Sequence, residues 1–385
     1  MKILISMTEP FIVRSLMRGH LKWLVDKGHS VTVMCGQGSD IEWILEQGVE
    51  VSTVSMKRRP SIFKDIKCLI EMIFILRRLR PDIIHYSTPK SSFITPLAIF
   101  LGRLKSGVVY TVRGRVYENK VGLKKWLFQL VDKFSCRMAE KVIFISRELK
   151  DDFIHQNIVK EKKAILIGLG SSNGFDTSVF RLPSINEKID AKNYFKLEKK
   201  AKVISYVGRL APDKGADDLF KVFKSMSSYD SFMNFLIIGK IEIQLDDLLK
   251  KYNIDPSRLI ISDWCADIHK GYWASDVTVF PSFREGFGNV CVESILCGAP
   301  IVSYDVVGCR ESVKQGISGY MVPLRDTNAM VQKIINLFED NDQRDMMVAK
   351  GSEWAKKSFN QEIIWNGILK IYSNLVSEVK SKDPI

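Results

Sequence analysis

Short runs of apolar, β-branched residues alternate with helix-length segments along the first half of the chain. The runs KILIS (2–6), HSVTVMC (29–35) and VEVSTV (49–54) are typical of strands, and residues 14–27 have the spacing of a helix. The alternation continues through a helical segment at 61–80 and the apolar runs DIIHYS, VVYTV, KVIFIS and KAILIG. Repeated strand–helix units indicate a parallel sheet covered by helices, so the pattern predicts a doubly wound α/β domain.

A second series of strand-like runs follows a polar, lysine-rich segment at 183–202. Its members are VISYVG, NFLIIG, RLIIS, VTVFPS and APIVSY, each followed by a helical or loop segment. We therefore expect an N-terminal Rossmann-like domain over 1–182, a linker at 183–202 and a second Rossmann-like domain over 203–360. The remaining residues, 361–385, are amphipathic with helical spacing and are predicted to form a C-terminal helix and tail.

The charge of the chain is uneven. The 385 residues carry a formal net charge of +13, and residues 51–150 alone contain 21 Lys plus Arg against 7 Asp plus Glu. Such a surplus attracts lipid head groups, phosphorylated substrates or nucleic acid. No RNP-type, zinc-binding or aromatic-interleaved basic motif accompanies it, so no nucleic-acid partner is expected.

Signals for a membrane span, for secretion and for metal binding are weak. No stretch without Asp, Glu, Lys or Arg exceeds 12 residues, and the start MKILISMTEP lacks the features of a signal peptide, so we expect a cytoplasmic protein. The seven cysteines are scattered without C-x-x-C spacing, which favours reduced thiols over disulfides or zinc. The acidic string at 340–342 follows a helical pattern and is interpreted as a helix end, so no metal is expected.

The first candidate site lies in VISYVGRLAPDKG. A strand ends at Gly208, and the loop after it carries Arg209 and Lys214 toward a helix. Ligands of open α/β sheets bind at this carboxyl edge, where a guanidinium fork and a lysine charge would suit a diphosphate. The alternative is a solvated loop with two surface cations.

The second candidate site lies in PSFREGFGNVCVESILCGAP. Glu285 follows a strand, and Glu293 lies eight residues later, about one turn into a predicted helix. Free backbone N–H groups near Asn289 and Val290 would favour a phosphate, while carboxylates suit sugar hydroxyls. The alternative is a pair of acids with no ligand, one favouring the helix dipole and one exposed on the helix.

These motifs resemble a known family. EGFGNVCVE, VGRL and DKG are similar to the donor-site signature of retaining glycosyltransferases of family four, and PDIIHYSTPK, IGLGSSNGFDTSVF and GCRESVKQGISGYMVPLRD extend the resemblance over most of the chain. The forms are most similar to bacterial enzymes that extend polyprenyl-diphosphate-linked sugars in O-antigen, capsule or glycan assembly. The resemblance implies a GT-B fold: two Rossmann-like domains facing a cleft, with a C-terminal helix packing back toward the first.

The resemblance also implies roles for individual residues. Arg209, Lys214 and Glu285 are the expected catalytic residues, which hold the donor diphosphate, stabilise the leaving nucleotide and meet the donor sugar. The expected donor-binding residues are Gly208, Gly286, Phe287, Gly288, Asn289, Val290, Glu293, Asp263 and Asn173. The donor is expected to be a UDP-sugar, used without a cofactor or a metal, and retention would come from same-face attack with the departing phosphate as base.

The acceptor side departs from the family pattern. Many relatives carry a histidine where this chain reads YTVRGRVYE, so Arg113 occupies the corresponding place. The acceptor-binding candidates are Arg14, His85, Lys90 and Arg113. For Arg113 a basic loop without a ligand is the alternative, and for His85 it is a buried histidine with satisfied hydrogen bonds. For Asn173 the alternative is a turn without a ligand.

The helical segment at 61–80 has apolar positions flanked by arginines and lysines. It predicts docking on an anionic membrane, with a core helix as the alternative. Together with the resemblance, the sequence predicts transfer of an N-acetylated hexose from a UDP-sugar to a polyprenyl-diphosphate-linked saccharide, by a protein peripheral to the inner face of the membrane. A sugar-nucleotide epimerase and a non-catalytic basic module that binds membrane or nucleic acid are the alternatives.

Overall fold

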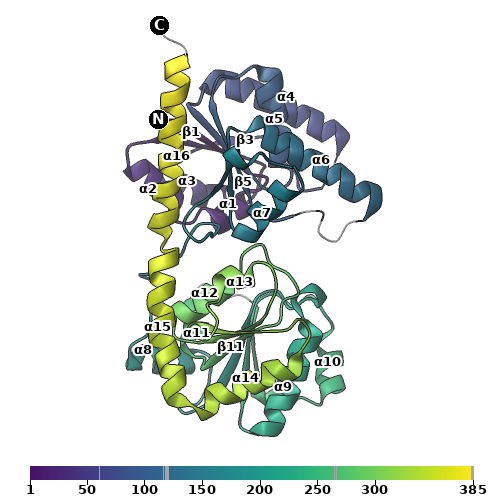
Figure 1. Cartoon of the computed structure of the whole chain (residues 1–385), viewed down its shortest axis with the longest axis vertical. Helices are drawn as coiled ribbons and strands as arrows, with labels where there is room; N and C mark the ends of the chain where they lie inside the picture. Colours follow the sequence, from purple (N-terminus) through teal and green to yellow (C-terminus); the bar gives the residue numbers. More distant parts are fainter. Residues whose placement is uncertain (60, 116, 118–120, 264, 266, 383–385) are drawn as a thin grey trace. The chain divides into compact units, whose positions relative to one another are not determined.

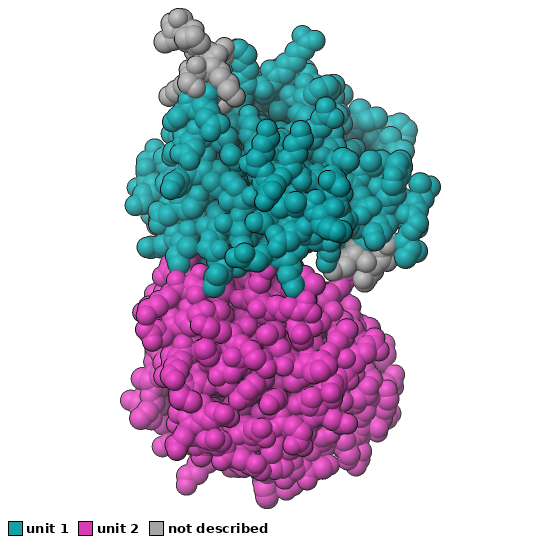
Figure 2. Space-filling model, viewed as in Figure 1, with its two compact units in different colours: residues 1–174, 362–385 teal, residues 175–361 magenta. Residues whose placement is uncertain are grey.

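The chain forms two compact units, each built around its own parallel sheet (Figures 1 and 2). The computed structural model describes all residues except 60, 116, 118–120, 264, 266 and 383–385. Unit 1 contains residues 1–174 and 362–385, and unit 2 contains residues 175–361. The two predicted parallel sheets are thereby confirmed.

The sheet of unit 1 has the strand order β3-β2-β1-β4-β5-β6-β7, and every pairing in it is parallel. Its strands are β1 (Lys2–Ser6), β2 (Ser30–Cys35), β3 (Glu50–Thr53), β4 (Ile83–Ser87), β5 (Gly107–Val112), β6 (Lys141–Phe144) and β7 (Ala164–Leu166). The central strands β1, β4 and β5 are buried along nearly their whole length, which explains their continuous apolar sequence.

Helices cover both faces of this sheet (Figure 1). They are α1 (Pro10–Leu16), α2 (His20–Asp26), α3 (Ile41–Glu46), α4 (Ile62–Leu79), α5 (Ser91–Gly102), α6 (Gly122–Met138), α7 (Arg147–His155) and α16 (Gln361–Lys382), with a short 3-10 turn η1 (Glu161–Lys163). The last helix, α16, packs Trp365, Ile368 and Tyr372 into the core formed by β1 and its neighbours. The predicted return of a C-terminal helix to the first domain is confirmed.

Unit 2 has the strand order β10-β9-β8-β11-β12-β13, again all parallel. The strands are β8 (Val203–Val207), β9 (Asn234–Ile238), β10 (Leu259–Ser262), β11 (Val277–Phe280), β12 (Ile301–Tyr304) and β13 (Gly319–Val322). The helices are α8 (Ile185–Tyr194), α9 (Ala216–Tyr229), α10 (Leu245–Tyr252), α11 (Ile268–Trp273), α12 (Asn289–Leu296), α13 (Cys309–Ser312), α14 (Thr327–Glu339) and α15 (Asn341–Phe359), with 3-10 turns η2 (Pro212–Lys214) and η3 (Pro256–Arg258).

The segment 183–202 differs from the expected linker. It begins with a capping box, in which the Ser184 hydroxyl and the Glu187 carboxylate each accept a hydrogen bond from the other's backbone N–H, and it continues as α8. Ala191 and Phe195 are buried in a cluster with Tyr272 of α11. The segment is therefore part of unit 2, and the lysines that suggested a linker lie around an apolar stripe.

No helix within the described residues is both long enough and apolar enough to cross a membrane.

Candidate active site

The first candidate site lies at the carboxyl edge of the sheet of unit 2. Strands β8 and β11 are neighbours in the sheet and run in the same direction, so the loops that follow them emerge at one edge. These loops carry the residues predicted from VGRLAPDKG and from SFREGFG. Neighbouring β12 adds the loop that leads to Gly308 at the same edge.

Two glycines fix the close packing of these loops. Gly215 has φ 74°, and a Cβ there would stand 2.0 Å from the carbonyl oxygen of Pro281. Gly308 has φ 83°, and a Cβ there would stand 2.8 Å from the carbonyl oxygen of Glu285. A side chain fits neither place, so both loops touch through backbone.

The pair of Lys214 and Glu285 is the centre of the site. The Lys214 Nζ lies 2.7 Å from Glu285 Oε1, and the two side chains are only 20% and 15% exposed. The ammonium also lies 3.5 Å from the carbonyl oxygen of Arg284. A lysine and a carboxylate held together at a strand edge offer a cation to a phosphate and acceptors to sugar hydroxyls.

Arg209 lies in the same loop as Lys214, but its side chain contacts other carboxylates than Glu285. Its side chain is 49% exposed, and its guanidinium pairs with Glu242 at 2.5 Å and lies 3.7 Å from Asp213. The structure therefore brings Arg209 to the expected edge while pairing it with a carboxylate that sequence reasoning did not identify. Its backbone is fixed by Tyr206, whose hydroxyl donates to the Arg209 carbonyl at 2.7 Å.

The glycine-rich turn before α12 is held by its own backbone. The N–H of Gly288 donates to the Gly308 carbonyl at 3.0 Å, and the N–H of Asn289 donates to the Phe287 carbonyl at 2.9 Å. The prediction of a free N–H at Asn289 is therefore wrong. The ring of Phe287 is buried and packs edge-on against Phe359, so its side chain belongs to the core of unit 2.

Glu293 lies in the second turn of α12 and is largely shielded from solvent. The hydroxyl of Tyr272 donates to its Oε2 at 2.8 Å. Burial raises the pKa of the Glu293 carboxyl, and the hydrogen bond from Tyr272 opposes this shift. The alternative of an exposed helix glutamate is not what the structure shows.

The expected surroundings of the base are only partly described. Asp263 is exposed just after β10, and Cys265 is buried. Residues 264 and 266 lie outside the described part of the chain.

A second set of predicted residues lies at the carboxyl edge of the sheet of unit 1. Arg113 follows β5 directly, and its guanidinium donates to the Ser87 hydroxyl at 3.4 Å, to the Ser172 carbonyl at 3.1 Å and to the Ser172 hydroxyl. Burial lowers the pKa of Arg113 to about 10. Its hydrogen-bond partners among the described residues are neutral oxygens, so no described carboxylate pairs with this half-buried cation.

His85 is a buried histidine with both ring nitrogens engaged. Its Nδ1 lies 2.5 Å from the Tyr372 hydroxyl, and its Nε2 lies 2.7 Å from the Thr111 hydroxyl. Burial, with a smaller contribution from Arg113, lowers its pKa to about 3. This geometry favours the structural alternative over the predicted contact with an acceptor.

Two further acceptor candidates form ion pairs within unit 1. Arg14 is half-exposed and pairs with Asp40 at 2.8 Å. Lys90 lies at the start of α5 and pairs with Asp65 at 2.6 Å, while also donating to the Arg59 carbonyl at 2.8 Å. Neither pair places its cation beside Arg113 in the contacts described.

Asn173 also uses its side chain inside unit 1. Its Nδ2 donates to the Arg18 carbonyl at 2.9 Å, and its Oδ1 accepts from the Trp365 indole at 2.9 Å. The positive φ of 71° belongs to the following Gly174. Asn173 thus joins α16 to the end of α1, and only its backbone is left for the predicted role.

Three contributors to the site of unit 2 escaped sequence prediction: Tyr206, Tyr272 and Gly308. The Tyr272 hydroxyl contacts Glu293, 21 residues later in the chain, and the Tyr206 hydroxyl contacts the Arg209 carbonyl, three residues later. Neither contact follows from the apolar spacing of a strand or helix. Gly308 had a signal, since it follows a strand in SYDVVGCRE, where a turn glycine indicates close backbone packing. The described residues contain no group of three or more His, Cys, Asp or Glu arranged to hold a metal.

Both halves of the chain are similar to known glycosyltransferase families. Residues 15–170 match the family described as "Glycosyl transferase 4-like domain", and residues 187–354 match "Glycosyl transferases group 1". CapM, a capsular polysaccharide biosynthesis glycosyltransferase of Staphylococcus aureus, is 31% identical over 369 residues, which cover 95% of this chain and 96% of CapM. The UDP-Gal:alpha-D-GlcNAc-diphosphoundecaprenol alpha-1,3-galactosyltransferase of Escherichia coli is 26% identical and covers 82% of each chain.

The fold has a counterpart among solved structures. HepE of Anabaena, solved in complex with UDP, superposes with a TM-score of 0.79 at 18% identity, covering 97% of this chain and 100% of HepE. This likeness concerns the fold alone, and it agrees with the predicted GT-B architecture of two Rossmann-like domains. On the similarity to CapM over nearly the whole of both chains, and on the two family matches, the chain belongs to the group 1 glycosyltransferases with a glycosyltransferase 4-like N-terminal domain.

Proposed function

We propose that this protein transfers a hexose from a UDP-sugar to a polyprenyl-diphosphate-linked saccharide during the synthesis of a bacterial surface polysaccharide. The functions of two relatives support it: CapM is a glycosyltransferase of capsular polysaccharide biosynthesis, and the Escherichia coli enzyme is named for a UDP-Gal donor and a diphosphoundecaprenol-linked acceptor. The complex of HepE with UDP supports the choice of nucleotide. An N-acetylated hexose remains the donor sugar that we propose to test first.

The pair of Lys214 and Glu285 is the observation that carries the proposal. In the proposed reaction the Lys214 ammonium turns from Glu285 to the donor diphosphate, where negative charge grows as the nucleotide leaves. Glu285 then accepts hydrogen bonds from the sugar hydroxyls, and Glu293 does the same for the ribose. Arg209 would exchange Glu242 for a phosphate oxygen. We propose that retention comes from same-face attack, with the departing phosphate as base and without a metal.

Arg113 supplies a cation for the proposed acceptor. It is half-buried beside Ser87 and Ser172 at the carboxyl edge of the sheet of unit 1, and neutral oxygens alone are its described partners. A partly desolvated guanidinium without a carboxylate is stabilised by binding a phosphate. We therefore assign the acceptor diphosphate to Arg113.

The catalytic proposal is tested by Lys214→Ala and Glu285→Ala. Transfer should fall by at least about a hundredfold in each, since loss of one charge-stabilising group typically costs that much. The assay measures UDP release and labelled sugar on the lipid-linked acceptor, and thermal unfolding confirms that each variant is folded. Product formed from UDP-sugar alone would instead indicate an epimerase.

Lys251→Ala is the matched control for this test. Lys251 pairs with Asp217 at 2.6 Å on the exposed surface of unit 2. Its loss removes the same charge and an ion pair of the same kind, and no described ion pair joins Lys251 or Asp217 to Lys214 or Glu285, so transfer should be unchanged. Normal turnover in Lys214→Ala or Glu285→Ala would count against the assignment.

Membrane association is proposed from the exposed surface of three helices in unit 1. Helix α5 packs between α4 and α6, and the three lie side by side on one face of the sheet (Figure 1). Large apolar side chains are exposed along them: Ile62, Phe63, Ile66, Ile70 and Phe74 on α4, Phe93, Phe100 and Leu101 on α5, and Leu123, Trp126 and Leu127 on α6. We call this set the α4–α6 surface.

An anionic bilayer is the partner whose chemistry fits the α4–α6 surface. The surface lies within residues 51–150, which carry the surplus of 14 positive charges. Exposed apolar groups of this size, interspersed with lysines and arginines, are typical of interfacial binding. We propose that the protein binds peripherally to the cytoplasmic face of the membrane, where a lipid-linked acceptor resides.

A further inference from the structure

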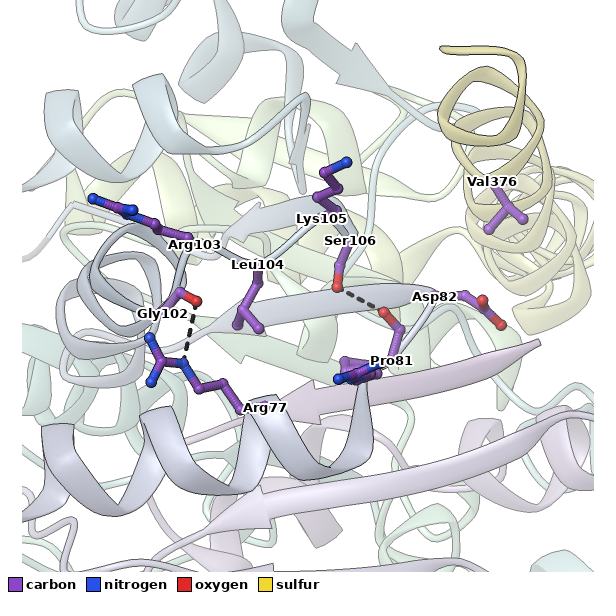
Figure 3. A pocket seen from close by; sticks show the side chains of 10 residues that line it. Arg77, Pro81, Asp82, Gly102, Arg103, Leu104, Lys105, Ser106 and Val376 are labelled. Carbon is purple, nitrogen blue, oxygen red and sulfur yellow. Dashed lines mark hydrogen bonds between the residues drawn. The ribbon is translucent and has the colours of Figure 1, made fainter. Parts of the chain in front are cut away.

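A hollow of about 540 Å³ opens at the amino edge of the sheet of unit 1 (Figure 3). It lies where α4 and α5 end and where β4 and β5 begin, at the opposite ends of these strands from Arg113. It is lined by Arg77, Arg80, Pro81, Asp82, Gly102, Arg103, Leu104, Lys105, Ser106 and Val376. We call it the basic hollow.

The basic hollow has a clear excess of positive charge. Four of its residues are cations and one, Asp82, is a carboxylate, whose Oδ2 already accepts the Lys2 N–H at 2.7 Å. Within the described part of the chain, no carboxylate lies at ion-pair distance from Arg77, Arg80 or Arg103. Guanidinium groups gathered around one hollow repel one another, so an anion placed among them is stabilised.

The floor of the hollow is fixed by internal hydrogen bonds. Figure 3 shows the Arg77 side chain directed toward Gly102, whose carbonyl accepts from Arg77 Nε at 3.4 Å, and the Ser106 hydroxyl directed toward the Pro81 carbonyl at 2.6 Å. These contacts join the end of α4 to the end of α5 and to the turn before β5. The cations are therefore carried by a built framework and not by one loop.

The backbone at two of these arginines is unusual. Arg80 and Arg103 are the C-cap residues of α4 and α5, and both have left-handed backbone, with φ 44° and 49°. Glycine is the usual residue in that conformation, because a side chain strains it. Compensation of the helix dipole does not explain Arg80, since Arg77 and Arg78 already provide cations in the last turn of α4. Arg80 is therefore a strained cation at the basic hollow that its helix end does not require, whereas Arg103 is the cation at the end of α5, whose last turn has none.

The α4–α6 surface leads into the basic hollow. The exposed residues Phe63, Ile66, Ile70 and Phe74 follow helical spacing along α4, and Arg77 comes three residues later on the same side. On α5, the exposed Phe100 and Leu101 lie three and two residues before Arg103, and Leu104 adds an apolar wall. The apolar part of an amphipathic anion bound in the basic hollow would therefore lie along α4 and α5.

We infer that the basic hollow binds the phosphate of an anionic phospholipid head group. The inference rests on the proposed association of unit 1 with a membrane, and it adds a head-group site at the amino edge of the sheet, separate from the carboxyl edge that holds Arg113. The phosphate is held by the arginines, and the glycerol and upper acyl chain pack on Leu104 and Val376.

The test is calorimetric titration of the full-length protein with dihexanoyl phosphatidylglycerol below its micelle-forming concentration. A monomeric lipid has no surface potential, so surface charge alone does not retain it. Wild type should bind saturably, and the Arg80→Gly, Arg103→Gly double variant should bind about 25-fold more weakly, at roughly fivefold for each lost cation. Glycine suits the left-handed backbone at both positions, so the variant should remain folded.

The matched control is the double variant Lys67→Gln, Arg78→Gln. Both residues are exposed on α4 outside the basic hollow, and the variant removes the same number of charges. It should bind the lipid like the wild type. Equal losses in the two double variants, or no binding by the wild type, would overturn the inference.

Inorganic phosphate distinguishes the source of the anion. The lipid should bind at least about tenfold more tightly than inorganic phosphate, because only the lipid contacts the apolar wall. Equal affinities would show a site for free anions and would overturn the assignment to a lipid. Since the titration contains neither donor nor acceptor, lipid binding without sugar transfer would contradict the proposed function alone, and transfer without lipid binding would contradict this inference alone.

Discussion

Lys214 and Glu285 hold one another in place at the carboxyl edge of the sheet of unit 2. The pair is largely shielded, so its 2.7 Å contact is screened less than a surface ion pair would be. Gly215 and Gly308 allow the loops that carry the pair to pack backbone against backbone. Both side chains are thus ordered in the absence of a ligand, and under the proposed function this order would reduce the entropy lost on binding.

His20 introduces a pH dependence into the stability of unit 1. It is buried and stacked on Trp365 at 5.4 Å, and burial, with a smaller contribution from Arg113, lowers its pKa from 6.5 to about 3. Because the folded-state pKa lies below the unfolded value, the unfolded chain takes up the proton first as the pH falls. The stability that neutral His20 provides above pH 6.5 is therefore lost between pH 6.5 and about 3.

The variant His20→Phe should keep the stacking and remove this titration. Between pH 8 and pH 5, protonation of His20 in the unfolded chain should lower the free energy of unfolding of the wild type by about 2 kcal/mol. The variant lacks this loss, so its free energy of unfolding relative to the wild type should rise by the same amount. Denaturant unfolding of unit 1 at the two pH values measures it. The exposed His155→Gln serves as the control, and an advantage that does not change with pH would contradict the prediction.

Each of the helices α4, α5 and α6 has a buried inner face and an exposed outer face. Their inner faces pack on the sheet, as Met72 and Leu76 of α4 do, while their outer faces expose large apolar side chains. The amphipathic spacing at 61–80 identified α4 in the sequence, but it did not indicate which apolar positions would be exposed. Burial depends on the neighbouring α5, which local periodicity does not contain.

The double variant Phe63→Ser, Trp126→Ser tests the α4–α6 surface as an element. These side chains are 87% and 55% exposed, so the change should leave thermal stability nearly unaltered. Partitioning onto vesicles of phosphatidylcholine with phosphatidylglycerol should fall by at least about tenfold, because two inserted aromatic groups are lost.

Phe232→Ser is the control for vesicle binding. Phe232 is 71% exposed in unit 2, outside the α4–α6 surface. Its replacement should leave partitioning unchanged. Unaltered partitioning of Phe63→Ser, Trp126→Ser would contradict the proposed membrane association. It would not affect the proposed catalytic role of Lys214 and Glu285.

At the scale of the whole molecule, the sequence predicted the two sheets because buried parallel strands are continuous apolar runs that local reading detects. It also located the loops with Lys214 and Glu285, since ligand sites of such sheets follow strand ends. It did not predict the pairing of Arg209 with Glu242, because the two residues meet only after β8 and β9 are side by side. The prediction of a linker at the lysine-rich segment 183–202 was wrong for a similar reason. The apolar residues of this segment are buried by contact with α11, which lies far from it in the sequence.

Helix α16 gives a prediction for the whole chain. Its Ile364, Trp365, Ile368, Tyr372 and Leu375 are buried in the core of unit 1. Their burial contributes an upper estimate of about 10 kcal/mol, which is comparable with the total stability of a typical domain. Deletion of 362–385 should therefore unfold unit 1 and leave unit 2 folded.

Hydrogen exchange followed by mass spectrometry measures this outcome peptide by peptide. Peptides from 1–174 should lose protection, and peptides from 175–361 should keep it. Deletion of 379–385, which leaves the five core residues named above in place, should change neither. Protection of 1–174 in the longer deletion would show that the sheet of unit 1 is stable without α16.

The place of α16 in the chain also dictates an order of events during synthesis. The ribosome produces the seven strands of unit 1 first and the helix that completes their core last, after all of unit 2. The strands of unit 1 therefore wait for the codons of α16 before their core is complete. A nonsense mutation between the codons of unit 2 and those of α16 would damage the half that is translated before unit 2.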